Sequence, residues 1–217
     1  MPSSTVENYL KAIYGIAEEA GDLGLVPIGK IAESLELTPG TVSTMMKHLD
    51  REGFIKYHPR KGVELLGPGR ETALQVLRRH RLIELFLVEV LHLDWAHVHE
   101  EAEVLEHALS DLLVERIDEM LGRPAYDPHG DPIPDATGAM REDRSRSLVD
   151  CVPGPCRLVR VSRDAPDFLK WLQKAGLRPG TELQVMGHDR LGGIVEVEIS
   201  GNPLRLGEAA ASDLWVV

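Results

Sequence analysis

Residues 38–66 are TPGTVSTMMKHLDREGFIKYHPRKGVELL, and this segment sets the architecture of the N-terminal part of the chain. Thr38 offers an N-cap hydroxyl, and Pro39 suits the first turn of a helix that Gly53 closes. FIKYH and GVELL have the composition of short strands, joined by a Pro-Arg-Lys-Gly turn. With the short helix expected from IGKIAESLEL just before it, this order predicts a winged helix-turn-helix.

The helix that begins at Thr38 carries small polar residues at its start, where a recognition helix approaches base pairs. Basic residues farther along the helix and in the turn can neutralise phosphates. The predicted DNA-binding residues are Thr38, Pro39, Gly40, Thr41, Ser43, Thr44, Lys47, Arg51, Arg60 and Lys61. Two other interpretations remain open: a winged helix that binds protein, and an ordinary helical domain with solvated charges.

Charge is distributed unevenly along the chain. The whole sequence has a net charge of −11, which argues against bulk electrostatic binding to nucleic acid. Residues 38–61, however, hold 5 basic and 2 acidic residues, whereas residues 71–125 hold 5 basic and 12 acidic residues. A locally basic segment therefore precedes a strongly acidic one.

The acidic part is expected to form two helices, from about Pro68 to Leu91 and from about Asp94 to Met120. Both are more apolar than the surface of a monomer tolerates, which predicts a dimer interface. In the second helix, four residues fall on one face within about 100° of arc. These residues are His99, Glu103, Glu106 and His107, and their imidazoles and carboxylates predict a divalent-metal site. The alternative is a solvated acidic helix with incidental histidines.

The C-terminal part alternates like short strands separated by glycine-rich turns, with one helix, PDFLKWLQKAG, between the first two strands. The expected fold is therefore mainly α with a small β domain. The expected divisions are a winged helix-turn-helix over residues 1–70, a helical metal-binding and dimerisation domain over 71–125, a loop and linker over 126–150, and an SH3-like barrel over 151–217.

Other classes of protein fit the sequence less well. No apolar run is long enough to cross a bilayer, and the N-terminus lacks the pattern of a secretory signal. Cys151 and Cys156 make no disulfide framework, so a reduced cytoplasmic protein is expected. The segment HVHEEAEVLEH lacks the HExxH order of zinc hydrolases, and an enzyme would not require a winged helix.

The winged helix, the segment RRHRLIELFL and the motif HVHEEAEVLEH together resemble the diphtheria-toxin-repressor and manganese-transport-regulator family of metal-dependent repressors. The resemblance covers nearly the whole chain, including the turn GDPIP and an SH3-like barrel of the FeoA kind. It implies two metal sites per subunit. The first resembles a set formed by Asn8, Glu103, Glu106 and His107. The second resembles His80, Glu84 and His99, with Asp164 and Asp167 as the positional match for oxygen ligands from the barrel.

The chain departs from both branches of that family. Iron-type members have a thiol at the position of Glu103, whereas manganese-type members have a carboxylate there, as this chain has. Asn8 offers only a neutral carbonyl oxygen, and Lys11 stands where manganese-type members have a second carboxylate. Some ligand assignments also have simpler alternatives. His80 and Glu84 could be a surface i,i+4 pair, and Asp164 could cap the following helix while Asp167 favours its first turn.

The resemblance implies a homodimeric, metal-activated repressor of metal-uptake genes that binds a palindromic DNA operator, with Mn²⁺ favoured and Fe²⁺ as the other candidate. The donor set of mostly oxygen with one imidazole suits Mn²⁺. An iron-responsive regulator of the same family is one alternative. A winged-helix regulator with a purely structural metal site is another.

Overall fold

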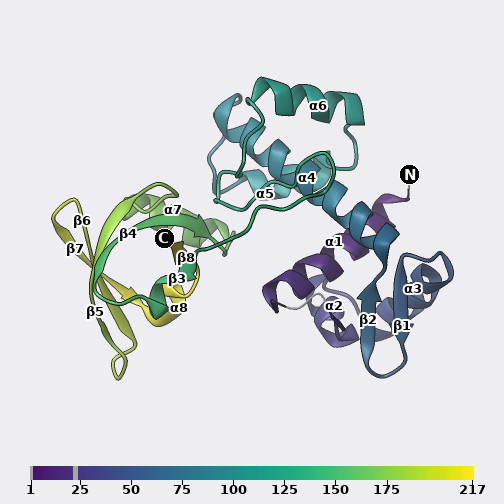
Figure 1. Ribbon diagram of the computed structural model, residues 1–217, viewed down its shortest axis with the longest axis horizontal. Coiled ribbons are helices and arrows are strands. Elements are labelled where there is room, and N and C mark those ends of the chain that lie inside the picture. The colour runs from purple at the N-terminus through teal and green to yellow at the C-terminus, as the bar shows by residue number, and fades with distance from the viewer. Residues whose placement is uncertain (1, 22–23) are drawn as a thin grey trace. The chain divides into compact units, whose positions relative to one another are not determined.

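The computed structural model describes residues 2–21 and 24–217 (Figure 1). The chain divides into two compact units. The first comprises Met1–Arg79 with Pro134–Ala139, and the second comprises His80–Ile133 with Met140–Val217. Across the described parts of the chain, none of the helices combines the length and apolar character needed to cross a membrane.

The first unit contains the predicted winged helix-turn-helix, which is confirmed. Its helices are α1 (Ser4–Glu19), α2 (Ile28–Ser34) and α3 (Pro39–Arg51), and its wing pairs β1 (Ile55–His58) with β2 (Gly62–Leu65) in antiparallel register. The core is formed by fully buried apolar side chains from the helices and the wing, namely Leu10, Ile13, Ile31, Met46, Leu49 and Ile55.

One side-chain hydrogen bond caps the start of the recognition helix, and another joins its other end to the wing. The Thr38 hydroxyl accepts from the backbone N–H of Thr41 at 3.2 Å, so Thr38 is the N-cap as expected. At the other end, the Asp50 carboxylate accepts from the backbone N–H of Tyr57 at 2.8 Å. Helix α3 and the first strand of the wing are therefore joined through Asp50 and Tyr57.

The second unit begins within α4 (Gly67–Glu89), which belongs to both units, and continues with α5 (Val98–Leu105) and α6 (Asp111–Met120). The prediction of one helix from Asp94 to Met120 was wrong. Helix α5 ends at the C-cap Glu106, and the Ser110 hydroxyl accepts from the backbone N–H of Leu113 to begin α6. Ser110, followed by Asp111, can cap a new helix, whereas the apolar periodicity of the segment alone predicts that the first helix continues.

The rest of the second unit is an antiparallel sheet of six strands in the order β3-β8-β4-β5-β6-β7, which confirms the expected SH3-like fold. Its long strands follow the predicted segments, and two short strands, β3 and β8, escaped prediction. The elements are β3 (Arg146–Ser147), the 3-10 turn η1 (Leu148–Asp150), β4 (Gly154–Val161), α7 (Pro166–Lys174), β5 (Glu182–Asp189), β6 (Ile194–Ile199), β7 (Asn202–Gly207), α8 (Glu208–Ala211) and β8 (Leu214–Val216). The register of β4 with β8 and of β5 with β6 shifts once each, and such bulges increase strand twist. Cys151 and Cys156 are both free, as expected.

The segment between α4 and α5 attaches the helices to this sheet domain. Trp95 and Ala96 are buried in the same hydrophobic cluster as Leu158, Leu169 and other core residues of the sheet domain. The indole N–H of Trp95 donates to the side-chain oxygen of Gln173 on α7 at 3.0 Å. The helices and the sheet domain thus share one core within the second unit.

The loop after α6 packs against β4 at Gly130. Gly130 has φ +90°, and a Cβ there would overlap the carbonyl oxygen of Val159. We expect Gly130→Ala to destabilise the second unit by more than the ~1–3 kcal/mol of backbone strain alone, seen as a lower Tm in calorimetry. Gly122→Ala is the control, because Gly122 also has positive φ (+76°) but open space around its Cβ position. Equal Tm losses for the two variants would contradict this prediction.

Candidate metal centre

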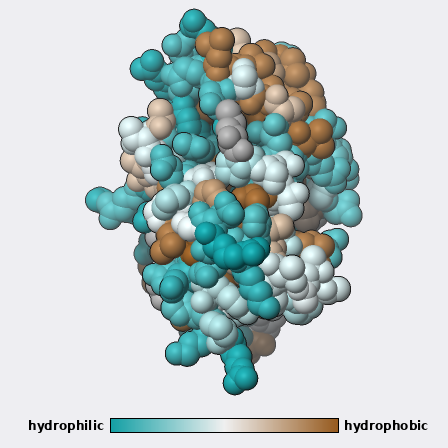
Figure 2. Space-filling model, turned by 90° about the vertical axis from the view of Figure 1, so that its right-hand side faces the viewer, coloured by the Kyte–Doolittle hydropathy of each residue, from teal (hydrophilic) through white to brown (hydrophobic). Residues whose placement is uncertain are grey.

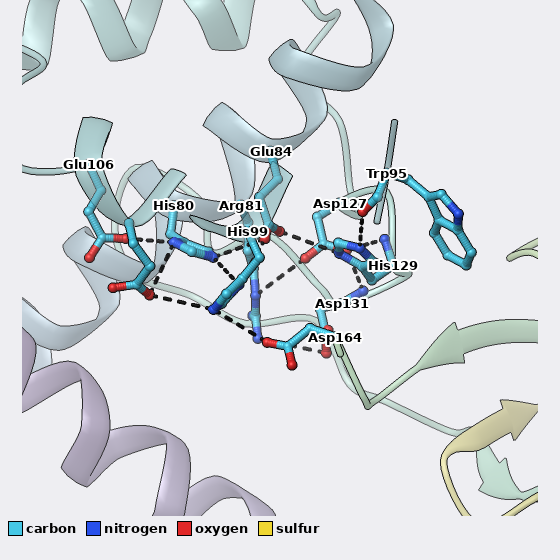
Figure 3. Close-up of polar contacts among 11 residues, drawn as sticks. His80, Arg81, Glu84, Trp95, His99, Glu106, Asp127, His129, Asp131 and Asp164 are labelled. Atoms are coloured by element: carbon cyan, nitrogen blue, oxygen red, sulfur yellow. Dashed lines mark hydrogen bonds and ion pairs between the residues drawn. The ribbon is translucent and has the colours of Figure 1, made fainter. Parts of the chain in front are cut away.

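His80, on α4, lies at the middle of a buried polar cluster (Figure 3). Its Nδ1 is 2.6 Å from Oε2 of Glu106, and its Nε2 is 3.0 Å from Oε1 of Glu84. The exposed fractions are 5% for His80, 2% for Glu84 and 0% for Glu106. The interpretation of His80 and Glu84 as a surface pair is therefore wrong, because both residues are buried. Of the four residues of the stripe, Glu106 is buried as well, whereas the side chains of His99 and Glu103 are each 38% exposed.

His99, on α5, extends the cluster toward the sheet domain. Its Nδ1 is 3.2 Å from Oε1 of Glu84, and its Nε2 is 3.3 Å from Oδ2 of Asp164. Its Nε2 also lies 3.8 Å from Oε1 of Glu103. His80, His99 and Glu103 each offer one ligand atom, and these atoms lie within 4.8 Å of one another. The structure thus brings together residues that the sequence assigned to two different sites.

The two aspartates predicted from the barrel differ in position. Asp164 does not cap α7, whose N-cap is Ala165 without a side-chain cap hydrogen bond, and its carboxylate faces His99 instead. Asp167 lies exposed in the first turn of α7. Among the described residues, no hydrogen bond or ion pair joins Asp167 to His99 or Glu84, so its role as a ligand stays a prediction.

The first predicted set is only partly assembled within one unit. Nε2 of His107, in the turn after α5, is 3.3 Å from Oε1 of Glu106. Glu106 therefore faces His80 with one oxygen and His107 with the other. Asn8 lies half-buried on α1 in the first unit, so its role as a ligand stays a prediction.

Asp127 and His129, in the loop after α6, were not predicted from the sequence as potential ligands. Together with Glu84 they form a second group of potential ligands, all buried, with one atom from each within 4.8 Å of the others. Nδ1 of His129 is 3.6 Å from Oε2 of Glu84. The available signal was the segment DPHGD at residues 127–131, which places acids and a histidine in a tight turn.

Burial and neighbouring charges shift the pKa values of Glu84, Asp127 and His129 away from their ordinary values. Burial alone would raise the pKa of Glu84, but hydrogen bonds with His129, His80 and His99 hold it well below its usual range. Burial raises the pKa of Asp127 to about 7, helped by the carboxylates of Asp131 and Glu84. Burial would lower the pKa of His129, but Glu84 and Asp127 raise it to about 9.

This donor set fits a divalent first-row metal ion. Imidazole nitrogens and carboxylate oxygens bind Mn²⁺, Fe²⁺ and Zn²⁺, and the cluster contains no thiolate that would select a softer ion. Buried carboxylates such as Glu84 and Glu106 also need compensating positive charge, which a divalent ion supplies. The residues are therefore suited to hold a metal inside the helical part of the second unit.

The predicted DNA-binding residues in the first unit lie on its surface. Thr38, Thr41 and Thr44 are exposed at the start of α3, and the Thr44 hydroxyl donates to the carbonyl of Gly40 at 3.0 Å. A hydroxyl that donates to the backbone keeps its lone pairs for an incoming donor. The other predicted residues are exposed too, except Ser43, which is half-exposed: Pro39, Gly40, Lys47, Arg51, Arg60 and Lys61.

Models of known domain families match three successive parts of the chain. Residues 1–63 match the N-terminal DNA binding domain of iron dependent repressors. Residues 67–135 match the metal binding and dimerisation domain of the same repressors, and residues 147–217 match the FeoA domain.

Relatives align over much of the chain. The diphtheria toxin repressor of Corynebacterium glutamicum is 33% identical over 215 residues, covering 93% of this chain and 91% of that protein. The iron-dependent repressor IdeR of Mycobacterium leprae is 39% identical over 131 residues, which cover 60% of this chain and 55% of that protein. A manganese-dependent transcriptional repressor in complex with manganese has a TM-score of 0.90 and 37% identity, covering 98% of this chain and 99% of that chain.

The winged helix and the buried histidine–carboxylate cluster define a metal-dependent, DNA-binding regulator. The chain belongs to the family of the diphtheria toxin repressor and the iron-dependent repressors. It is therefore a metal-dependent transcriptional repressor of that family and not an enzyme.

Proposed function

We propose that this repressor responds to Mn²⁺, and that metal loading raises its affinity for a palindromic DNA operator controlling metal-uptake genes. The observation that carries the proposal is the position of His80, whose two ring nitrogens face Glu106 and Glu84 within the helical domain. Oxygen donors outnumber nitrogen donors, and a carboxylate, Glu103, stands where iron-type members have a thiol. This donor set suits Mn²⁺, but raw affinity would favour Zn²⁺ or Cu²⁺, so coordination geometry or the availability of metal in the cell would supply the discrimination. Since operators are chromosomal, the repressor would act in the cytoplasm.

Two sites per subunit are proposed. Glu106, His107 and Glu103 would hold the first ion, with Asn8 as a further ligand. His80, Glu84 and His99 would hold the second, with oxygen donors from Asp164 and Asp167. Asp164 already lies 3.3 Å from His99, which supports its place in the second set.

The repressor is proposed to act as a homodimer through α5 and α6. Both helices expose large apolar side chains, including Val104 at 71% and Leu112 at 70% exposure. Figure 2 shows hydrophobic side chains gathered at the upper right of the view, beside hydrophilic ones at the upper left. A contiguous apolar surface of this kind marks an interface, and a twofold dimer presents two recognition helices to a palindromic site.

A bound ion would supply the positive charge that the buried carboxylates of the cluster need. An ion that binds only the DNA-competent conformation stabilises it by about 2.7 kcal/mol when free metal is a hundredfold above Kd. Metal bound by Glu106 and His107, and by the ligands of the second site, would thereby shift the population toward the conformation that binds the operator.

Metal removal tests this proposal. DNA affinity is measured by fluorescence anisotropy on a duplex selected from a random library with the Mn²⁺-loaded protein. We expect affinity to rise by about 100-fold from chelator to saturating Mn²⁺, with Fe²⁺ under anaerobic conditions and Zn²⁺ as comparisons. Equal affinity with metal and with chelator would favour the alternative of a purely structural site. Activation by Fe²⁺ at lower free concentration than Mn²⁺ would favour the iron-responsive alternative.

A further inference from the structure

The side chain of Arg160, on β4, joins several segments of the second unit. Its Nη1 lies 3.5 Å from Oδ1 of Asp131, in the loop after α6, and its Nη2 lies 3.3 Å from Oδ2 of Asp143, in the segment before β3. Its Cζ atom lies 4.2 Å from the ring centroid of Trp215 on β8. Oδ1 of Asp131 is also 3.8 Å from Nη2 of Arg81 on α4. Arg160 therefore links the sheet to the loop, to the segment before β3 and, through Asp131, to α4.

The backbone of the sheet directs this side chain. Arg160 pairs with Trp215 across β4 and β8, and the register of these strands shifts between Leu158 and Arg160. A bulge of this kind redirects the side chain beside it. Because the indole covers one face of the guanidinium, the N–H groups point outward in its plane, where two nitrogens can meet two separate carboxylates. A lysine ammonium lacks this planar fork.

Both carboxylates are held in place by their own segments. Oδ1 of Asp143 accepts the backbone N–H and the hydroxyl of Ser145, at 2.8 Å and 2.6 Å. Burial would raise the pKa of Asp143, but the hydrogen bonds from Ser145 and the charge of Arg160 lower it below its ordinary value. The backbone N–H of Asp131 donates to Oδ1 of Asp127 at 2.9 Å. Arg160 thus contacts groups whose positions are already fixed locally.

The chain that follows Arg160 leads directly to the proposed second metal site. The backbone N–H of Val161 donates to the carbonyl of His129, in the same loop, at 2.8 Å. Three residues later, Oδ2 of Asp164 lies 3.3 Å from Nε2 of His99 (Figure 3). In the described part of the chain, Asp164 makes no other ion pair or side-chain hydrogen bond. The packing of β4 on the loop therefore sets where this carboxylate lies.

We propose that Arg160 is a positioning residue for the second metal site. By holding β4 to Asp131 and Asp143, its side chain places Asp164 within reach of His99. The inference rests on the proposed function in that Asp164 and His99 are taken as ligands of one ion. Groups that orient a metal ligand strongly affect affinity, and their loss typically costs about 10- to 100-fold.

A second, apolar anchor separates this role from folding. Trp95 is buried in the hydrophobic cluster of the sheet domain, and its indole N–H donates to Gln173 on α7 at 3.0 Å. Apolar burial is non-directional, whereas a guanidinium binds carboxylates in a defined geometry. We therefore expect Trp95 to keep the sheet domain attached when Arg160 is replaced, and Arg160 to determine the orientation of β4.

The test measures the Mn²⁺ affinity of the full-length protein, with free Mn²⁺ followed by electron paramagnetic resonance. Arg160→Gln should weaken binding of the second-site ion by about 10-fold and leave the first-site ion unchanged. Arg157→Gln is the matched control, because Arg157 is exposed on the same strand and carries the same charge. It should keep wild-type affinities. Wild-type affinities for both ions in Arg160→Gln would overturn the proposal.

A double-mutant cycle distinguishes positioning from general destabilisation. Asp164→Asn should weaken the same ion, and Arg160→Gln should add little to that loss, because Arg160 acts through Asp164. A purely structural role of Arg160 predicts instead that the two losses add. Additive losses would therefore overturn the proposal.

A measurement without metal keeps the result independent of ion binding. Arg160→Lys retains the charge but not the planar fork. In metal-free crystals of this variant, Oδ2 of Asp164 should lie farther from Nε2 of His99 than the 3.3 Å of the wild type. An unchanged separation would overturn the proposal. A wild type without a second ion would overturn both this proposal and the proposed second site, whereas DNA affinity independent of metal would overturn the proposed function alone.

Discussion

Replacing Glu106 by glutamine is expected to abolish the rise in DNA affinity that metal produces. Glu106 is fully buried, and its two oxygens face His80 at 2.6 Å and His107 at 3.3 Å. Glutamine preserves the shape and a hydrogen bond to His80, but it removes the negative charge that a divalent ion requires. At a metal concentration that gives wild type about 100-fold activation, the variant should bind the operator as wild type does with chelator.

Glu100→Gln provides the matched control, because Glu100 lies exposed in the first turn of α5. It removes the same charge from the same helix and should keep full activation. Anisotropy titrations of both variants, with and without Mn²⁺, give the comparison. Wild-type activation in Glu106→Gln would exclude Glu106 from the activating site, and loss of activation in both variants would point to the general charge of α5 instead.

The double variant Lys47→Ala/Arg51→Ala should weaken operator binding and nonspecific DNA binding alike. Both side chains are exposed toward the C-terminal end of α3, where they can reach phosphates beside the bases read by the start of the helix. The slope of log affinity against log salt should fall by about 0.9 for each phosphate that the variant no longer neutralises. Anisotropy measured between about 50 and 200 mM salt, a range in which phosphate neutralisation strongly affects affinity, gives the slope.

The control for this prediction removes the same amount of charge elsewhere. Lys174→Ala/Arg190→Ala changes two exposed basic residues of the sheet domain, so the net charge of the protein changes equally. Its salt slope should match that of wild type. Equal slopes for all three proteins would contradict the assignment of Lys47 and Arg51 to phosphate binding.

Local sequence signals predicted the winged helix because each of them acts over a few residues. Thr38 caps its helix, Gly53 follows its end with φ +78°, and the wing has the expected strands. The same local reasoning failed between Leu105 and Asp111. There, the apolar periodicity of the sequence continues and predicts one unbroken helix. The Ser110 hydroxyl instead caps a second helix. One long helix and two short ones differ by only a few hydrogen bonds.

Most residues of the metal cluster could be predicted from the sequence, but the contacts between them could not. His80 and Glu84 are four residues apart on α4 and His99 lies on α5, so helical spacing and the family resemblance together named them. Glu84 also forms a buried group with Asp127 and His129, which are more than 40 residues away in sequence and lie in the loop after α6. No periodicity relates such positions.

The sequence by itself determined the class of protein: a winged helix-turn-helix, a helical segment with histidines and carboxylates, and a small β domain. These features depend on caps, turns and repeats, whose physics is local. Only the tertiary structure decided that Glu106 and Glu84 share His80, that Asp164 turns to His99 instead of capping α7, and that His129 faces Glu84. Burial decides these pairings, because a charged group that is removed from water must be paired, and the packed helices and loops determine which partners are close enough.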